Sequence, residues 1–122
     1  ILLIASILSK DQINDFIKIT KEYEMGCIVE IHNEEELNKI SDIKDIEIIG
    51  INNRNLNTLE INTETTLNLA GKIPNDKIII SESGISSKED LNKIKDKVNA
   101  ILVGSLFMNS NNIENEITAL TK

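Results

Sequence analysis

Five short runs of apolar residues, each followed by polar residues and then by a helical pattern, constrain the fold of this chain more than any other feature. The runs are nearly continuous rather than alternating, which is typical of strands that are covered on both faces. Their alternation with helices across short turns predicts a parallel sheet with right-handed crossovers. The predicted strands are Ile1–Leu8, Cys27–Ile31, Ile46–Ile51, Lys77–Ser81 and Ala100–Val103.

Five helices are expected between and after these strands, and capping patterns indicate where several of them begin. The first is expected from Lys10 to about Met25, with Ser9 and Gln12 as a capping pair and Gly26 at its end. The second begins after Asn33 with Glu36, and the third runs from Asn62 or Thr63 to before Pro74. The fourth begins after Ser86 with Glu89, and the fifth runs from about Asn111 onward. The order is therefore five βα units in one α/β domain over residues 1–122. A closed (β/α)8 barrel needs eight units, which five do not reach.

Composition excludes several classes of partner. Acidic residues outnumber basic ones by 20 to 13, giving a net charge of −7, which disfavours nucleic acid and anionic membrane surfaces as partners. Cys27 is the only cysteine and cannot form an internal disulfide, which fits a reducing cytoplasm. One histidine and one cysteine, far apart in the pattern, suggest no metal site, and no apolar run reaches the roughly 18 residues of a membrane span.

Residues suited to chemistry follow four of the predicted strands. The carboxyl ends of parallel strands meet at one edge, so these residues are expected to converge. Glu30 and Glu82 each interrupt an apolar strand, where a carboxylate is costly unless it is paired or functional, and they are candidates for acid–base catalysis. A structural ion pair is the alternative for Glu30. Asn52 can orient a substrate, and Arg54 can bind a carboxylate or phosphate through its planar fork.

Two glycine–serine turns and three further polar residues complete the candidates. Glycine at Ser83-Gly84 and Gly104-Ser105 lets the backbone approach a ligand, and free N–H groups at a helix start attract phosphate. Two ordinary βα turns are the alternative. His32 is expected to be solvated or helix-capping rather than catalytic, and Asn53 and Asn55 are expected to stabilise a loop.

Four motifs together resemble those of the indole-3-glycerol-phosphate synthase family. They are Val29-Glu30-Ile31-His32, Ile49-Gly50-Ile51-Asn52-Asn53-Arg54-Asn55-Leu56, Ser81-Glu82-Ser83-Gly84-Ile85 and Leu102-Val103-Gly104-Ser105. The second motif is the most specific, because the glycine turns also occur in other phosphate-binding barrels. The resemblance covers the entire chain. It implies a partial (β/α)8 barrel whose five βα units correspond to strands four to eight of that family's barrel.

The resemblance implies decarboxylative ring closure of 1-(2-carboxyphenylamino)-1-deoxyribulose 5-phosphate to indole-3-glycerol phosphate in tryptophan biosynthesis, without a cofactor or metal. It implies catalytic roles for Glu30, Asn52 and Glu82. Arg54, Leu56 and Ser83 would bind the substrate, with Arg54 and Leu56 on its anthranilate side. Gly84, Gly104 and Ser105 would bind its phosphate.

Departures from the family pattern limit what this chain is expected to do alone. Asn109 stands where the family's last motif commonly ends in arginine, and Leu106 replaces a small residue. The family's general-acid lysine lies on the third strand, and a further lysine and glutamate lie on the first. We therefore expect negligible activity from the 122 residues alone, and association with a missing N-terminal half or a second copy through open sheet edges.

Two alternatives to this interpretation remain from the sequence. One is another phosphate-binding barrel enzyme, such as phosphoribosylanthranilate isomerase or the tryptophan synthase α subunit, against which the Asn52–Leu56 motif argues. The other is a non-enzymatic phosphate-binding half-barrel or gene remnant. The chain begins at Ile1, inside a predicted strand, so we expect it to be part of a longer protein.

Overall fold

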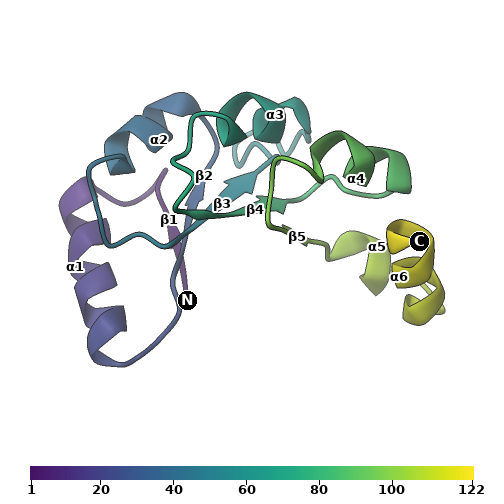
Figure 1. Cartoon of the computed structure of the whole chain (residues 1–122), viewed down its shortest axis with the longest axis horizontal. Helices are drawn as coiled ribbons and strands as arrows, with labels where there is room; N and C mark the ends of the chain where they lie inside the picture. The colour runs from purple at the N-terminus through teal and green to yellow at the C-terminus, as the bar shows by residue number, and fades with distance from the viewer.

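The computed structural model describes residues 1–122 and contains one parallel sheet of five strands in the order β1-β2-β3-β4-β5. The strands are β1 (Leu2–Ile4), β2 (Ile28–Ile31), β3 (Ile48–Asn52), β4 (Ile78–Glu82) and β5 (Ala100–Leu102). The helices are α1 (Lys10–Glu22), α2 (Glu34–Ile40), α3 (Glu64–Ala70), α4 (Lys88–Ile94), α5 (Ser105–Met108) and α6 (Ile113–Thr121). The sheet curves into an open arch, and helices α1 to α4 lie along its outer side (Figure 1). This architecture confirms the predicted partial barrel.

Side-chain caps fix most of the helix starts that the sequence predicts. Ser9 Oγ accepts from the backbone N–H of Gln12 at 3.2 Å, and the Gln12 side chain accepts from the Ser9 N–H at 2.9 Å. Asn33 Oδ1 likewise accepts from the N–H of Glu36 at 2.9 Å and begins α2. Such caps satisfy N–H groups that have no partner within the helix.

Three predicted boundaries are wrong. Only Leu2–Ile4 of the run Ile1–Leu8 forms a strand, and the chain then turns. Helix α1 ends at Glu22, and Glu24 rather than Gly26 adopts a positive φ of 54°. Helix α4 is capped one residue later than expected, because Ser87 Oγ accepts from the Asp90 N–H at 3.1 Å.

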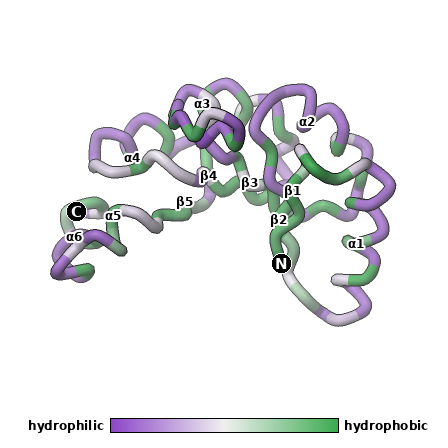
Figure 2. The backbone as a smooth tube through the Cα atoms, turned by 180° about the vertical axis from the view of Figure 1, so that it is seen from behind, coloured by the Kyte–Doolittle hydropathy of each residue, from purple (hydrophilic) through white to green (hydrophobic).

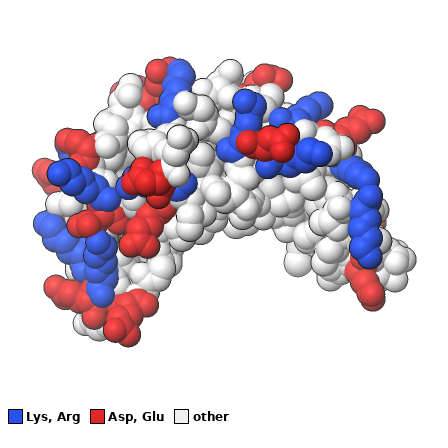
Figure 3. Space-filling model, viewed as in Figure 1, with Lys and Arg blue, Asp and Glu red and all other residues white.

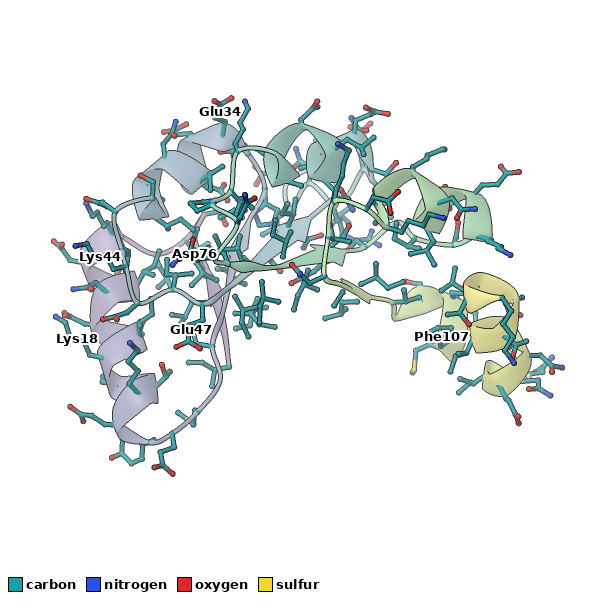
Figure 4. The ribbon with its side chains drawn as sticks, viewed as in Figure 1. Lys18, Glu34, Lys44, Glu47, Asp76 and Phe107 are labelled. Carbon is teal, nitrogen blue, oxygen red and sulfur yellow. The ribbon has the colours of Figure 1, made fainter.

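One helix was not anticipated at all. The four-residue α5 (Ser105–Met108) begins directly at the last glycine–serine turn, so that β5 is followed by two short helices. Side chains of α5 and α6, including Phe107, pack with α4 residues around a second small core made by Ile85, Ile94 and Leu120 (Figure 4). The predicted start of the final helix near Asn111 is confirmed, since Asn112 caps α6.

The two faces of the sheet differ because side chains alternate along each strand. The outer face meets α1, α2 and α3 and forms the main core, which includes Leu3, Val29, Ile31, Ile49, Ile51, Ile79, Ile13, Ile17, Leu37, Ile40 and Leu69. Seen from behind, the strands are mostly hydrophobic and the helices largely hydrophilic (Figure 2).

The inner face of the sheet is not covered by any helix. Leu2, Ile78 and Leu102 lie on this face and remain 46–51% exposed. Charged side chains gather over the outer helices, while the hollow beneath the arch is nearly free of them (Figure 3). Around these three residues the inner face is therefore apolar and open to water.

No helix of the structure is both long and apolar enough to cross a lipid bilayer.

Candidate active site

The two strand glutamates and Asn52 lie on the same, inner face of the sheet. In the strand register Glu30 pairs with Gly50, and Asn52, two residues further along β3, pairs with Glu82. Paired residues of parallel strands point to the same face, and so do residues two apart on one strand. The predicted convergence of Glu30, Asn52 and Glu82 at the carboxyl ends of the strands is therefore what the structure shows.

Glu82 is held in a position that favours its protonated form. Burial, and then the neighbouring Glu30 carboxylate, raise the pKa of Glu82 to about 7, from an ordinary value of 4.5. Both side chains are nearly buried, with Glu30 at 4% and Glu82 at 5% exposure. A carboxylic acid with its pKa near 7 beside a second carboxylate can donate or accept a proton near neutral pH.

Gly50 provides the space that the Glu82 carboxylate occupies. A Cβ atom built on Gly50 would lie 2.1 Å from Glu82 Oε1 and 3.0 Å from a methyl carbon of Ile28. Only a residue without a side chain allows the carboxylate to extend over β3 toward Glu30. Gly50 is thus part of the site, although the sequence predicted roles only for the asparagine and arginine that follow it in the motif.

Asn52, Arg54 and Leu56 line one cavity of about 530 Å³. Asn52 Oδ1 accepts from the Arg54 backbone N–H at 2.9 Å, which turns the chain out of β3 and leaves the Asn52 amide nitrogen free. The Arg54 guanidinium donates to the Leu59 carbonyl at 3.3 Å, and Leu56 is 43% exposed at the tip of the loop. The structure therefore brings these three predicted site residues to one cavity.

Ser83, Gly84, Gly104 and Ser105 line a second, adjoining cavity of about 700 Å³, to which Arg54 also contributes. Ser83 and Gly84 both adopt positive φ, 65° and 83°, and a Cβ on Gly84 would lie 2.5 Å from a methyl carbon of Ile61. The backbone N–H groups of Gly84 and Gly104 donate to no group of the chain. The predicted phosphate residues are therefore brought together around unpartnered donors.

The charges of this second cavity are balanced rather than basic. Arg54 and Glu116 are its only charged lining residues, and Glu116 comes from α6. Asn109 and Leu106, the two positions that depart from the family pattern, also line the cavity. Glu116 was not among the residues that the sequence predicted for the site.

Asn53 is buried beside the first cavity and makes several hydrogen bonds. Its Nδ2 donates to Ser81 Oγ, to the Glu82 carbonyl and to the Ser83 carbonyl at 2.9–3.1 Å, and its Oδ1 accepts from the N–H and hydroxyl of Thr66. Asn55 Oδ1 accepts from two loop N–H groups. The prediction that both asparagines stabilise the loop is confirmed, and Asn53 also ties β3 to β4 and α3.

His32 is neither solvated nor a helix cap, so its predicted role is wrong. Its side chain is 11% exposed and lies between two carboxylates, with Nδ1 3.0 Å from Glu36 Oε2 and Nε2 3.2 Å from Glu30 Oε1. Asn33, not His32, caps α2. The sequence carried only a weak signal for this arrangement. The spacing of Glu30, His32 and Glu36 brings the three together only if the strand leads directly into the first turn of α2.

Residues 1–120 match the family model described as indole-3-glycerol phosphate synthase. The chain belongs to the indole-3-glycerol phosphate synthase family. The indole-3-glycerol phosphate synthase of Methanocaldococcus jannaschii is 44% identical over 96% of this chain and 43% of the relative. That of Acetivibrio thermocellus is 42% identical over 96% of this chain and 45% of the relative, and that of Polaromonas naphthalenivorans is 43% identical over 88% and 41%.

The chain thus spans less than half the length of these synthase relatives. A more distant likeness shows the same fold. A chain in the crystal structure of the Amycolatopsis orientalis BexX/CysO complex superposes with a TM-score of 0.64 at 11% sequence identity, covering 92% of this chain and 46% of that one. This chain therefore matches only part of the synthase relatives and only part of that structure.

Proposed function

We propose that this chain supplies the C-terminal five βα units of an indole-3-glycerol-phosphate synthase. In that enzyme, 1-(2-carboxyphenylamino)-1-deoxyribulose 5-phosphate undergoes ring closure with loss of carbon dioxide and water. The observation that carries the proposal is the buried pair of Glu30 and Glu82 beside Asn52, at the strand ends of a chain from this family. Decarboxylative ring closure requires proton donation and removal, which such a pair provides.

Each remaining site residue then has a role that its position supports. Protonated Glu82 donates a hydrogen bond, and Glu30 exchanges protons with the substrate during the dehydration stage. The free Asn52 amide nitrogen contacts the substrate near its reacting centre, while Arg54 and Leu56 line the anthranilate side. No cofactor takes part in this scheme.

The phosphate of the substrate would occupy the second cavity. There the unpartnered N–H groups of Gly84 and Gly104 face the same space as Ser83 and Ser105. Backbone N–H groups of this kind bind phosphate oxygens without needing a basic side chain. Arg54 provides the single positive charge of the cavity wall.

The completing part is inferred to be three further βα units, joined to this chain or supplied by a partner, in the same reducing cytoplasm. A barrel of this type has eight strands, and this sheet has five with unpaired edges at β1 and β5. Two copies of this chain would bring ten strands and would place two pairs of Glu30 and Glu82 against each other. A three-stranded partner both closes the barrel and covers the exposed inner face.

The test is to measure indole-3-glycerol phosphate fluorescence with the chain alone and with an N-terminal segment of the Acetivibrio thermocellus relative that supplies the missing strands. We expect turnover only from the mixture or a fusion of the two. Glu30→Gln should then lower turnover by about 10²–10⁴-fold, whereas Glu47→Gln, an exposed control, should not. Normal turnover by the chain alone, or none from any completed assembly, would contradict the proposal.

Sedimentation of the chain tests the partner separately. We expect the chain alone to be marginally stable or self-associated and to form a defined one-to-one complex with the three-unit partner. A stable, well-folded monomer that ignores the partner would refute the inferred assembly.

A further inference from the structure

His32 joins two carboxylates that come from different elements. Its Nδ1 faces Glu36 Oε2 of α2 at 3.0 Å, and its Nε2 faces Glu30 Oε1 of β2 at 3.2 Å. The backbone N–H of His32 also donates to Glu36 Oε2 at 2.9 Å. The imidazole is therefore held at the strand exit from both ends, directly beside the pair proposed for catalysis.

Glu36 is fixed before it contacts the ring. It is 8% exposed, its Oε1 accepts from Asn33 Nδ2 at 2.9 Å, and its own N–H donates to Asn33 Oδ1 at 2.9 Å. A carboxylate with these partners acts as an acceptor toward His32, so the proton of the ring is placed on Nδ1. Nε2 is then the nitrogen that faces Glu30.

The structure leaves two buried side-chain atoms without a hydrogen-bond partner, His32 Nε2 and Glu82 Oε1. They belong to the two residues that flank Glu30. Nε2 lies 3.2 Å from Glu30 Oε1, within ion-pair distance, but forms no hydrogen bond with it in the structure. If neither His32 Nε2 nor Glu30 Oε1 carries a proton, two acceptors face each other in a buried site, which is unfavourable. Buried polar atoms without partners also call for a functional explanation.

We propose that His32 is a positioning residue for Glu30: Glu36 fixes the ring, and one proton shared between His32 Nε2 and Glu30 Oε1 orients the Glu30 carboxylate toward Glu82. The role rests on the proposed function of Glu30, whereas the contact itself does not. Arg54 and Glu60 are the other charged groups that line the cavity to which His32 is open. Neither forms a contact with the ring that competes with Glu30 or Glu36.

The contact can be tested by NMR, because His32 is the only histidine of the chain. The chain is labelled with ¹⁵N-histidine and studied bound to the unlabelled three-unit partner. We expect a slowly exchanging proton on Nδ1, and a change in the Nε2 resonance alone on Glu30→Gln. The exposed control Glu35→Gln, from the same helical turn as Glu36, should leave both nitrogens unchanged. A ring with rapidly exchanging tautomers, or an Nε2 signal unaffected by Glu30→Gln, would overturn the proposal.

The positioning role is tested by steady-state kinetics of the completed assembly. We expect His32→Leu to lower kcat about 10–100-fold with little change in KM, as for residues that orient a catalytic group. His32→Gln, which retains a donor, should recover part of the loss. Full kcat in a folded His32→Leu assembly, or an effect confined to KM, would refute the role. No turnover from the wild-type assembly would instead refute the proposed function, while the spectra still decide whether His32 binds Glu30.

Discussion

The raised pKa of Glu82 predicts an unusual dependence of stability on pH. A rise from 4.5 to about 7 means that the folded chain holds this proton more tightly than the unfolded chain. Below pH 4.5 both states are protonated and the full stability is present. Between pH 4.5 and about 7 the unfolded chain releases the proton first, so the free energy of unfolding falls as pH rises. Above about pH 7 the decrease levels off.

The magnitude follows from the size of this rise. In a fully desolvated site it is equivalent to about 3 kcal/mol. Water reaches the open inner face, and screening there reduces the expected contribution of this group to about 1–2 kcal/mol. Glu82→Gln keeps the shape of the neutral acid but has no proton to lose. It should therefore match the wild-type chain at pH 4.5 and exceed its stability by about 1–2 kcal/mol at pH 8.

Urea unfolding at pH 4.5, 6 and 8 measures this difference. Glu47→Gln, on the exposed segment before β3, is the matched control and should follow the wild-type curve. If Glu82→Gln lost stability between pH 4.5 and 8 as steeply as the wild-type chain, the proton would not reside on Glu82 and the acid assignment would be wrong.

Three further substitutions test other parts of the site. Gly50→Ala should displace the flexible Glu82 carboxylate. The free energy of unfolding should fall by about 1 kcal/mol or less and should depend less on pH than in the wild-type chain. Unfolding at two pH values checks both effects. Asn53→Ala should destabilise the chain by about 2–4 kcal/mol, because it leaves several buried groups unpaired, whereas Asn55→Ala in the exposed loop should cost about 1 kcal/mol or less by the same measurement. Glu116→Gln should strengthen phosphate binding about two- to fivefold by removing a like charge from the cavity wall; calorimetry with inorganic phosphate would show no gain if Glu116 does not face the anion.

Sequence patterns predicted the strands well where an apolar run was bounded by a charged residue or a turn. The prediction for Ile1–Leu8 was wrong because continuous apolarity does not separate a strand from the turn that follows it. Ala5 is fully buried yet lies outside β1, and Ile7 is 73% exposed. Helix caps succeeded at Ser9 and Asn33. The start of α4 was placed one residue early because Ser86 and Ser87 each precede an acidic residue by three positions, and only packing selects between them.

The site residues were recognisable by type and spacing, but their contacts were not. Convergence of Glu30 and Glu82 follows from parallel topology alone. The register that sets Gly50 beneath Glu82 depends on how β3 and β4 pair, which no local pattern specifies. His32 was discounted because an isolated histidine at a strand exit carries little information. Its two carboxylate partners become visible only once the turn into α2 is known.

Helices cover the outer face of the sheet and leave the inner face exposed, which affects how much of the protein a cell retains. Leu2, Ile78 and Leu102 present the kind of surface that chaperones retain and proteases clear when it stays uncovered. The steady-state level of these 122 residues, expressed by themselves, should therefore be low and should rise when the missing strands are fused to them or co-expressed with them. Pulse-chase lifetimes with and without the partner would register that dependence even where no catalysis can be measured.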